Sequence, residues 1–236
     1  ETADVVRKYG RARELARLVT KKGKELKRDI EANLLGNTVS TAGADSASAR
    51  WSAGLECMLF GNRVIATGSG GGNTTGTSPP YAANRWVVPT DGTATTFVEA
   101  DLISGIENAW TDGGDPSVVL CGMFNKRKIA GFSGATKYAG VSYNTTSKTN
   151  QGVIIGGVDL YISDAGEHKI MLSRFQRTRT LFGIDPDYVS IAWLRPIKMV
   201  ELAKTGDAEK RMLICEYTHV CDNPDAHFKI QDMTVS

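Results

Sequence analysis

Apolar side chains recur along residues 1–36 at the spacing of an amphipathic helix. Because an α-helix completes one turn every 3.6 residues or so, steps of three, four or seven residues draw one apolar stripe along a single face. The stripe consists of Tyr9, Ala12, Leu15, Val19, Leu26, Ile30 and Leu34. Gly36 then supplies a typical helix stop. The pattern predicts one long helix that ends at Gly36.

A second helix is predicted near the middle of the chain. Thr96 and Glu99 have the spacing of a capping box, in which each side chain bonds to the other's backbone N–H. The apolar face of this helix is expected to be Val98, Leu102, Ile106 and Ala109, with Gly113 and Gly114 at its end. A buried strand over residues 118–121 and a short helix over about 124–132 are expected to follow.

The last third of the chain changes to the pattern of strands. Runs rich in Val, Ile, Tyr and Phe cover residues 153–163, 168–173, 188–201, 210–221 and 227–233, with turns expected at 164–166 and 205–207. Polar segments rich in Gly, Ser, Thr and Asn predict exposed loops at 67–80 and 133–152. Helices first and strands later indicate an α+β fold.

Positive charge is concentrated in the first predicted helix. Residues 1–36 carry ten basic and six acidic side chains, whereas the whole chain has 28 basic and 26 acidic residues and a formal charge of +2. Affinity for nucleic acid rises with the number of phosphates neutralised, so any contact with DNA should be local and weak. A solvated helix face is the plainest explanation for such a charge run.

Composition excludes several classes of protein. No apolar run approaches the 18 or so residues of a membrane helix, and we predict no membrane partner. Four scattered cysteines make a poor disulfide framework, which favours synthesis in a reducing cytoplasm. The chain starts with glutamate rather than methionine, so we expect it to begin partway into a larger product.

Residues that suggest chemistry are sparse. Cys215, His219, Cys221 and His227 invite a zinc site, but residues four apart on a strand are about 13 Å apart, too far to share one metal. A closer approach of the last three across a turn is left open. The sequence contains no Gly-x-Ser-x-Gly nucleophile elbow that could act with His168. Gly68–Gly72 is not followed by the Lys and Ser/Thr of a phosphate-binding loop. We therefore predict no cofactor, no metal and no enzymatic activity.

Five stretches, taken in order, resemble one known family. They are GRARELARLVTKKGKELKRDI (10–30), WTDGGDP (110–116), LYISDAG (160–166), RFQRTR (174–179) and a C-terminal run that includes ELAKTGDAEKR (201–211). These strings are similar to those of tailed-bacteriophage major capsid proteins with the Hong Kong 97-like fold. Family members carry an N-terminal arm and an extended loop ahead of the long helix, and this chain shows neither.

The resemblance implies an α+β fold of two parts. A peripheral domain would hold the long spine helix and antiparallel strands, from residues 1–50 and 187–236. An axial α/β domain would hold residues 51–186. The final strand is equally compatible with a return to the axial domain.

Basic residues are the candidate subunit contacts. On the resemblance, Arg11, Arg17, Lys21, Lys24 and Arg28 of the helix, and Arg174, Arg177 and Arg179, are assigned to subunit interfaces. A lining that meets packaged DNA is the alternative for the helix, and intramolecular pairing is the alternative for the three later arginines. We favour contacts with neighbouring subunits as the role of the basic helix, because a shell that bound DNA tightly would hinder ejection of the DNA.

The expected function is that of a structural major capsid protein in the virion. It would self-assemble into hexamers and pentamers of an icosahedral head that encloses double-stranded DNA, with a portal and a cement or decoration protein as further partners. An encapsulin-like nanocompartment shell is the alternative of the same fold, and a DNA-binding protein that uses the basic helix is the alternative from another class. An aspartate at Leu26 or Ile30 should abolish folding or assembly, because a buried unpaired charge is costly.

Overall fold

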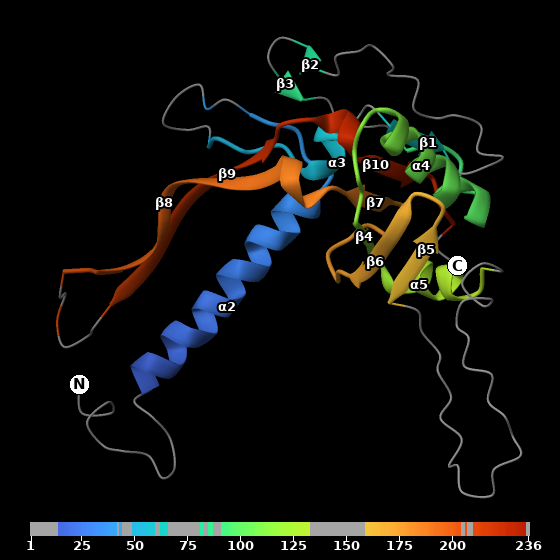
Figure 1. The fold of residues 1–236 in the computed structure, drawn as a ribbon. Helices are drawn as coiled ribbons and strands as arrows, with labels where there is room; N and C mark the ends of the chain where they lie inside the picture. The colour runs from blue at the N-terminus through green and yellow to red at the C-terminus, as the bar shows by residue number, and fades with distance from the viewer. Residues whose placement is uncertain are drawn as a thin grey trace, which may run out of the picture.

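The chain forms a mixed α+β structure in which a sheet body carries two long projecting elements (Figure 1). The computed structural model describes residues 14–41, 43, 49–59, 62–65, 81–82, 85–86, 91–132, 159–203, 206 and 210–234. The α+β class expected from the sequence is confirmed within these residues.

A six-stranded sheet forms the centre of the body. Its strands are β1 (Asn62–Ile65), β4 (Val118–Cys121), β5 (Leu160–Ser163), β6 (Gly166–Leu172), β7 (Leu181–Ile184) and β10 (Phe228–Gln231), and they lie in the order β1-β10-β7-β4-β6-β5. The pairs β1–β10 and β4–β6 are parallel, and the other three pairs are antiparallel. The final strand, β10, therefore sits between strands from residues 62–65 and 181–184.

One face of this sheet packs on two helices, α4 (Glu99–Thr111) and α5 (Met123–Ala130). Leu181, Val119 and Ile170 point from neighbouring strands into this layer, where they meet Ile106 and Ile129. The ring of Phe228 fills the space above Gly105 and Gly183, and a Cβ atom at either glycine would collide with it. Glycine is needed at both positions because the backbone approaches the ring so closely.

The opposite face packs on the end of α2 (Glu14–Leu35) and on the short helix α3 (Leu55–Met58). Successive residues of a strand point to opposite faces, so Phe182 faces this layer while Leu181 faces the other. Phe182 meets Leu35, Leu55 and Leu59 there. We call the six-stranded sheet with α3, α4 and α5 the sheet body.

Two elements extend away from the sheet body, and we call them together the projection (Figure 1). They are α2 and a two-stranded antiparallel ribbon of β8 (Val189–Glu201) and β9 (Arg211–Cys221). The ribbon's register shifts on either side of Arg195, beside Pro196, which has no N–H to donate to the ladder. Asn33 Nδ2 donates to Tyr217 Oη at 3.2 Å, a contact that joins α2 to the ribbon.

Small elements complete the described fold. A two-residue pair, β2 (Tyr81–Ala82) and β3 (Arg85–Trp86), forms a separate antiparallel bridge. Single turns of 3-10 helix, η1 (Pro186–Tyr188) and η2 (Pro224–Ala226), join the ribbon to the sheet at β7 and β10.

Several predicted elements are confirmed. The long helix ends at Leu35 and is followed by Gly36, while residues 1–13 lie outside the described part. The ranges of β4, α5, β8, β9 and β10 agree with expectation to within a few residues, and so does the turn before β6. The loops expected at 67–80 and 133–152 lie outside the described residues, as does most of 205–207.

Two expectations about local structure were wrong. The helix α4 begins at Glu99, and Asp101 Oδ2, rather than Glu99, accepts the backbone N–H at the helix start, from Val98 at 3.1 Å. Glu99 is the first residue of the helix, two residues before the capping position of Asp101, and Tyr161 Oη donates to it at 3.4 Å. The strands β1 and β7 were also missed, because all four residues of β7 are buried without alternation and β1 pairs with β10 near the other end of the chain.

Candidate functional site

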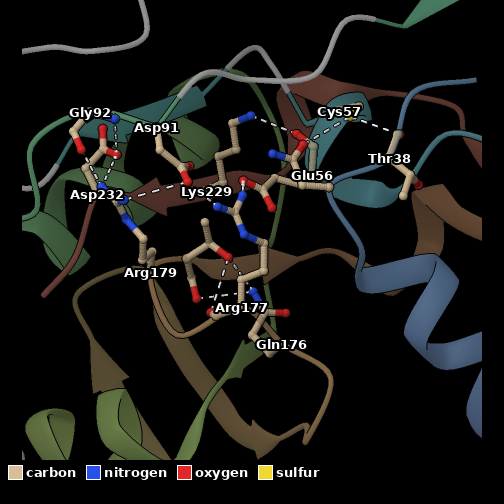
Figure 2. A network of polar contacts seen from close by, with 12 residues as sticks. Thr38, Glu56, Cys57, Asp91, Gly92, Gln176, Arg177, Arg179, Lys229 and Asp232 are labelled. Atoms are coloured by element: carbon tan, nitrogen blue, oxygen red, sulfur yellow. Dashed lines mark hydrogen bonds and ion pairs between the residues drawn. The ribbon is translucent and has the colours of Figure 1, made fainter. Parts of the chain in front are cut away.

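Arg177 and Arg179 lie in the segment between β6 and β7, where both are engaged within the chain (Figure 2). Arg177 donates to Glu56 Oε1 at 2.7 Å and also to Asp91. Arg179 donates to Asp232 Oδ1 at 3.2 Å and to the carbonyl of Gly92. These contacts tie α3, the segment before α4 and the end of β10 to one another.

A buried lysine completes this cluster. Lys229 Nζ donates to the carbonyl oxygen of Glu56 at 2.8 Å, and both residues are at most 2% exposed. Burial lowers the pKa of Lys229 to about 8 and raises the pKa of Glu56, against the pull of Arg177. Burial likewise raises the pKa of the adjacent Cys57 thiol to about 11, which leaves that thiol protonated and unreactive at neutral pH. The cluster is arranged to hold the sheet body together.

No local sequence pattern indicates the acidic half of this cluster. Glu56 and Arg177 are 121 residues apart, and Asp91 is 86 residues from Arg177. The assignment of Arg177 and Arg179 to a subunit interface stays a prediction, and their guanidinium groups already have partners inside the chain. Arg174 is exposed and has no ion pair among the described residues, so its side chain is available for another molecule.

The basic residues predicted on the first helix fall on one line. Arg17, Lys21, Lys24 and Arg28 are all exposed, and their spacing of four, three and four residues places them on a single face of α2. That face lies opposite Leu15, Val19 and Leu26, because residues about 180° apart occupy opposite sides of the helix. We call these four side chains the basic stripe. Arg11 lies outside the described residues.

Only the C-terminal turns of α2 are well buried. Ile30 and Leu35 are buried, and Glu31 Oε1 accepts a hydrogen bond from Ser173 Oγ at 2.6 Å. Leu18, nearer the start of the helix, is 44% exposed. The sheet body therefore anchors one end of α2 (Figure 1), and the side chains of the basic stripe are exposed to solvent.

The ribbon of β8 and β9 exposes large apolar side chains. They include Trp193, Met199, Val200 and Met212, and Leu194 is 77% exposed. The rings of Trp193 and Tyr217 lie 5.7 Å apart across the two strands. A ribbon of two strands is marginally stable by itself, so a surface of this kind is typical of a segment that packs against another molecule.

The histidines and cysteines that could have formed a catalytic or metal site lie in ordinary structural positions. His168 Nδ1 lies 2.7 Å from the Pro116 carbonyl, so it carries the hydrogen, and Nε2 accepts from Ser163 Oγ at 2.6 Å. His227 Nδ1 accepts from the backbone N–H of Asp185 at 3.0 Å. Cys215, His219 and Cys221 lie on β9. Within the described part of the chain, no three His, Cys, Asp or Glu residues are grouped to hold a metal ion.

A helix that crosses a bilayer needs about 20 mostly apolar residues. None of the described helices is long and apolar enough to do so.

Comparison with known proteins identifies the family. The family model of the SU10 major capsid protein matches residues 1–234. The chain belongs to the SU10 major capsid protein family. Membership implies a structural role in a bacteriophage capsid rather than an enzymatic one.

A curated relative and two solved structures are similar to the chain. The major capsid protein of Escherichia phage Phieco32 is 27% identical over 92% of this chain and 67% of its own length. The chain thus spans about two thirds of that relative. The encapsulin of the holo-SrpI complex from Synechococcus elongatus PCC 7942 matches with a TM-score of 0.56 and 13% identity, over 99% of this chain and 70% of that chain.

The second solved structure is a virus-like particle from Pyrococcus furiosus. It matches at a TM-score of 0.36 with 12% identity, over 59% of this chain and 54% of that chain, and this score is too low to indicate a shared fold. The encapsulin match shows that the fold is shared with a shell-forming protein.

Proposed function

We propose that this chain builds the icosahedral head of a bacteriophage as hexamers and pentamers, and that the head encloses double-stranded DNA. The observation that carries the proposal is the match of the capsid family model to residues 1–234. Under it, the chain is made in the bacterial host cytoplasm and ends up in the capsid shell of the virion.

The projection supports this proposal on physical grounds. A shell subunit must present different surfaces to successive neighbours, and rings form where head-to-tail contacts close. The ribbon offers exposed apolar side chains, among them Trp193 and Leu194, and α2 offers the basic stripe. Neither surface is covered by the sheet body, so both are available to neighbouring subunits.

The proposal also includes a division of the chain into a peripheral and an axial domain. Residues 1–50 and 187–236 would form the peripheral domain, with the spine helix and long strands, and residues 51–186 the axial domain around the capsomer centre. The strand β10 lies in the sheet with β1 and β7, which favours its return to the axial domain. The peripheral part would then end before Phe228.

The interface residues of the proposal are the basic stripe and Arg174. Arg11 is proposed with them from its sequence pattern alone, while Arg177 and Arg179 would contribute by holding the sheet body in shape. Packaged DNA would be met by weak, non-specific contacts, since the chain has a formal charge of only +2. A portal and a cement or decoration protein are the further partners proposed.

The test is the assembly of the chain expressed in bacteria. The purified protein is examined by sedimentation and negative-stain microscopy, and particles are treated with nuclease before their nucleic acid is measured. Closed particles made of this chain are expected, with nuclease-resistant DNA in particles isolated from infected cells. A protein that stays monomeric or dimeric at high concentration would contradict the proposal.

A protein-filled compartment is the second candidate, favoured by the structural match to an encapsulin. The contents of particles from the natural source separate the two. Co-purifying protein without DNA would favour the compartment, and nuclease-resistant double-stranded DNA favours the phage head.

A further inference from the structure

Acidic side chains gather where the ribbon joins the sheet body. The exposed aspartates are Asp112, Asp115, Asp187, Asp222 and Asp225, and we call them the acidic corner. The three segments that carry them, residues 110–117, 185–191 and 219–228, contain no lysine or arginine. Negative charge is therefore concentrated there without a compensating cation from the same segments.

Specific contacts hold these segments together. Asp185, which is buried, accepts the backbone N–H of Asp115 at 3.0 Å and that of Asp187 at 3.1 Å. The backbone N–H of Asp222 donates to the Tyr188 carbonyl at 3.0 Å. Gly114 lies directly against the backbone of Ala226, where a Cβ atom would not fit. The end of α4, η1 and η2 are thus fixed side by side, and the acidic corner is a built surface rather than a chance grouping.

Apart from Arg17, which interacts with another residue of the chain, the acidic corner and the basic stripe form no ion pairs within the described residues. Among the described residues, none of the five aspartates forms an ion pair, and neither do Lys21, Lys24 or Arg28. The helix that carries the stripe is anchored at its last turns and points away from the sheet body (Figure 1). One molecule therefore presents two surfaces of opposite charge that do not meet within it.

We propose that the basic stripe of one subunit docks on the acidic corner of a second copy of this chain. The inference rests on the proposed function and names the surface that the stripe recognises. Opposite potentials on two facing surfaces steer association and fix the register of a contact. Because the two surfaces differ, each copy places its basic stripe on one neighbour and accepts the basic stripe of another neighbour on its acidic corner. Such head-to-tail contacts propagate into rings. A symmetric pair of identical surfaces would stop at a dimer.

The test exchanges the charges of the two surfaces in the full chain. One variant carries Lys21→Glu and Lys24→Glu, a second carries Asp222→Lys and Asp225→Lys, and a third carries all four substitutions. Each pair should lower the yield of sedimenting particles by about tenfold or more, because like charges then face each other. The third variant restores opposite charges and should regain most of the yield.

Two control variants match the change in net charge elsewhere. Arg127→Glu with Lys128→Glu changes exposed residues of α5, and Asp164→Lys with Glu167→Lys changes exposed residues of the β5–β6 hairpin. Both should assemble like the unaltered chain. Far-ultraviolet circular dichroism of each variant verifies that it is folded before its particle yield is scored.

Three outcomes would overturn the inference. If the four-substitution variant assembles no better than the two pairs, the surfaces do not face each other. If only the lysine pair has an effect, and that effect is lower DNA content at normal particle yield, the stripe binds DNA instead. If the unaltered chain and the controls form no particles, the proposed function fails and the inference falls with it, whereas particles from the pairs at normal yield refute the inference alone.

Discussion

The sheet body and the projection differ in how many of their apolar side chains are buried and how many of their charges are paired within the chain. In the sheet body, both faces of the central sheet are covered over β7 and β4, and buried charges such as Glu56 have partners. In the projection, α2 exposes its charged face, and the ribbon exposes Leu194 and Trp193. The sheet body is thus largely complete within one chain, and under the proposed function the projection is the part that meets neighbouring subunits.

Removing a fully buried phenylalanine ring should have the largest effect on folding. Phe228 is fully buried between α4 and β7, so Phe228→Ala should lower the free energy of unfolding by about 4 kcal/mol. Urea denaturation followed by circular dichroism measures this loss. Met212→Ala in the ribbon, where the side chain is exposed, should change it by less than about 0.5 kcal/mol. Equal losses would remove the distinction between the two regions.

Breaking the ion pair of Arg177 should have the next largest effect. Arg177→Met leaves the buried carboxylate of Glu56 without its cation, and a loss of about 2 kcal/mol is expected because Arg177 itself is partly exposed. The double variant Glu56→Gln with Arg177→Met should recover part of that loss in the same urea experiment. Asp91→Asn is the control, and it should cost less because Asp91 is far more exposed than Glu56. An equal cost for both single variants would contradict the account.

The pH dependence of stability should carry a contribution from Lys229. Its pKa is lowered from 10.5 to about 8 by burial, so between those pH values the unfolded chain holds a proton that the folded chain has lost. Stability should therefore rise with pH in this window, by up to about 1.4 kcal/mol per pH unit. The measurement is the difference in unfolding free energy between the protein and Lys229→Met at several pH values.

The difference between the two proteins reports the contribution of Lys229 to the pH dependence of stability. The thiols of Cys57, Cys121 and Cys221 have pKa values raised to about 11, so the folded chain keeps their protons longer and stability falls with pH on their account. The charge of Lys229 lowers the pKa of the Cys57 thiol, so both proteins carry Cys57→Ala, and the opposing contribution of Cys121 and Cys221 then cancels. A difference that does not change with pH would show that Lys229 has an ordinary pKa.

The smallest effect on folding is expected where the effect on assembly is large. Leu194→Ser should change the free energy of unfolding by less than about 0.5 kcal/mol, because the side chain is exposed, yet should reduce the fraction of protein in particles. Met123→Ser is the matched control, since Met123 on α5 is 78% exposed and Leu194 is 77% exposed. The control should alter neither quantity. The account would fail if both variants assembled equally well.

Elements with a long, regular pattern could be predicted from the sequence. The stripe of Leu15, Val19, Leu26 and Ile30 defined α2, and Gly36 defined its end, because helical periodicity repeats over many turns. The strands β8 and β9 were predicted from runs of more than ten residues. In each case the signal is local and is repeated often enough to outweigh chance.

Elements decided by distant contacts could not be predicted. The four residues of β7 are all buried and show no alternation, and β1 becomes a strand by pairing with β10 at the far end of the chain. The partners of Arg177 and Arg179 come from α3, from the segment before α4 and from Asp232. The acidic corner likewise combines three separate segments. Such sites depend on the folded topology, which local patterns do not specify.

Hydrogen–deuterium exchange tests the central claim most directly, because it reads both regions in one experiment. Backbone exchange is compared between the unassembled chain and assembled particles. The account predicts slower exchange in the particles for α2 and the β8–β9 ribbon, and little change in β4, β7 and β10 of the sheet body. Unchanged exchange in the projection, or protection confined to the sheet body, would contradict it.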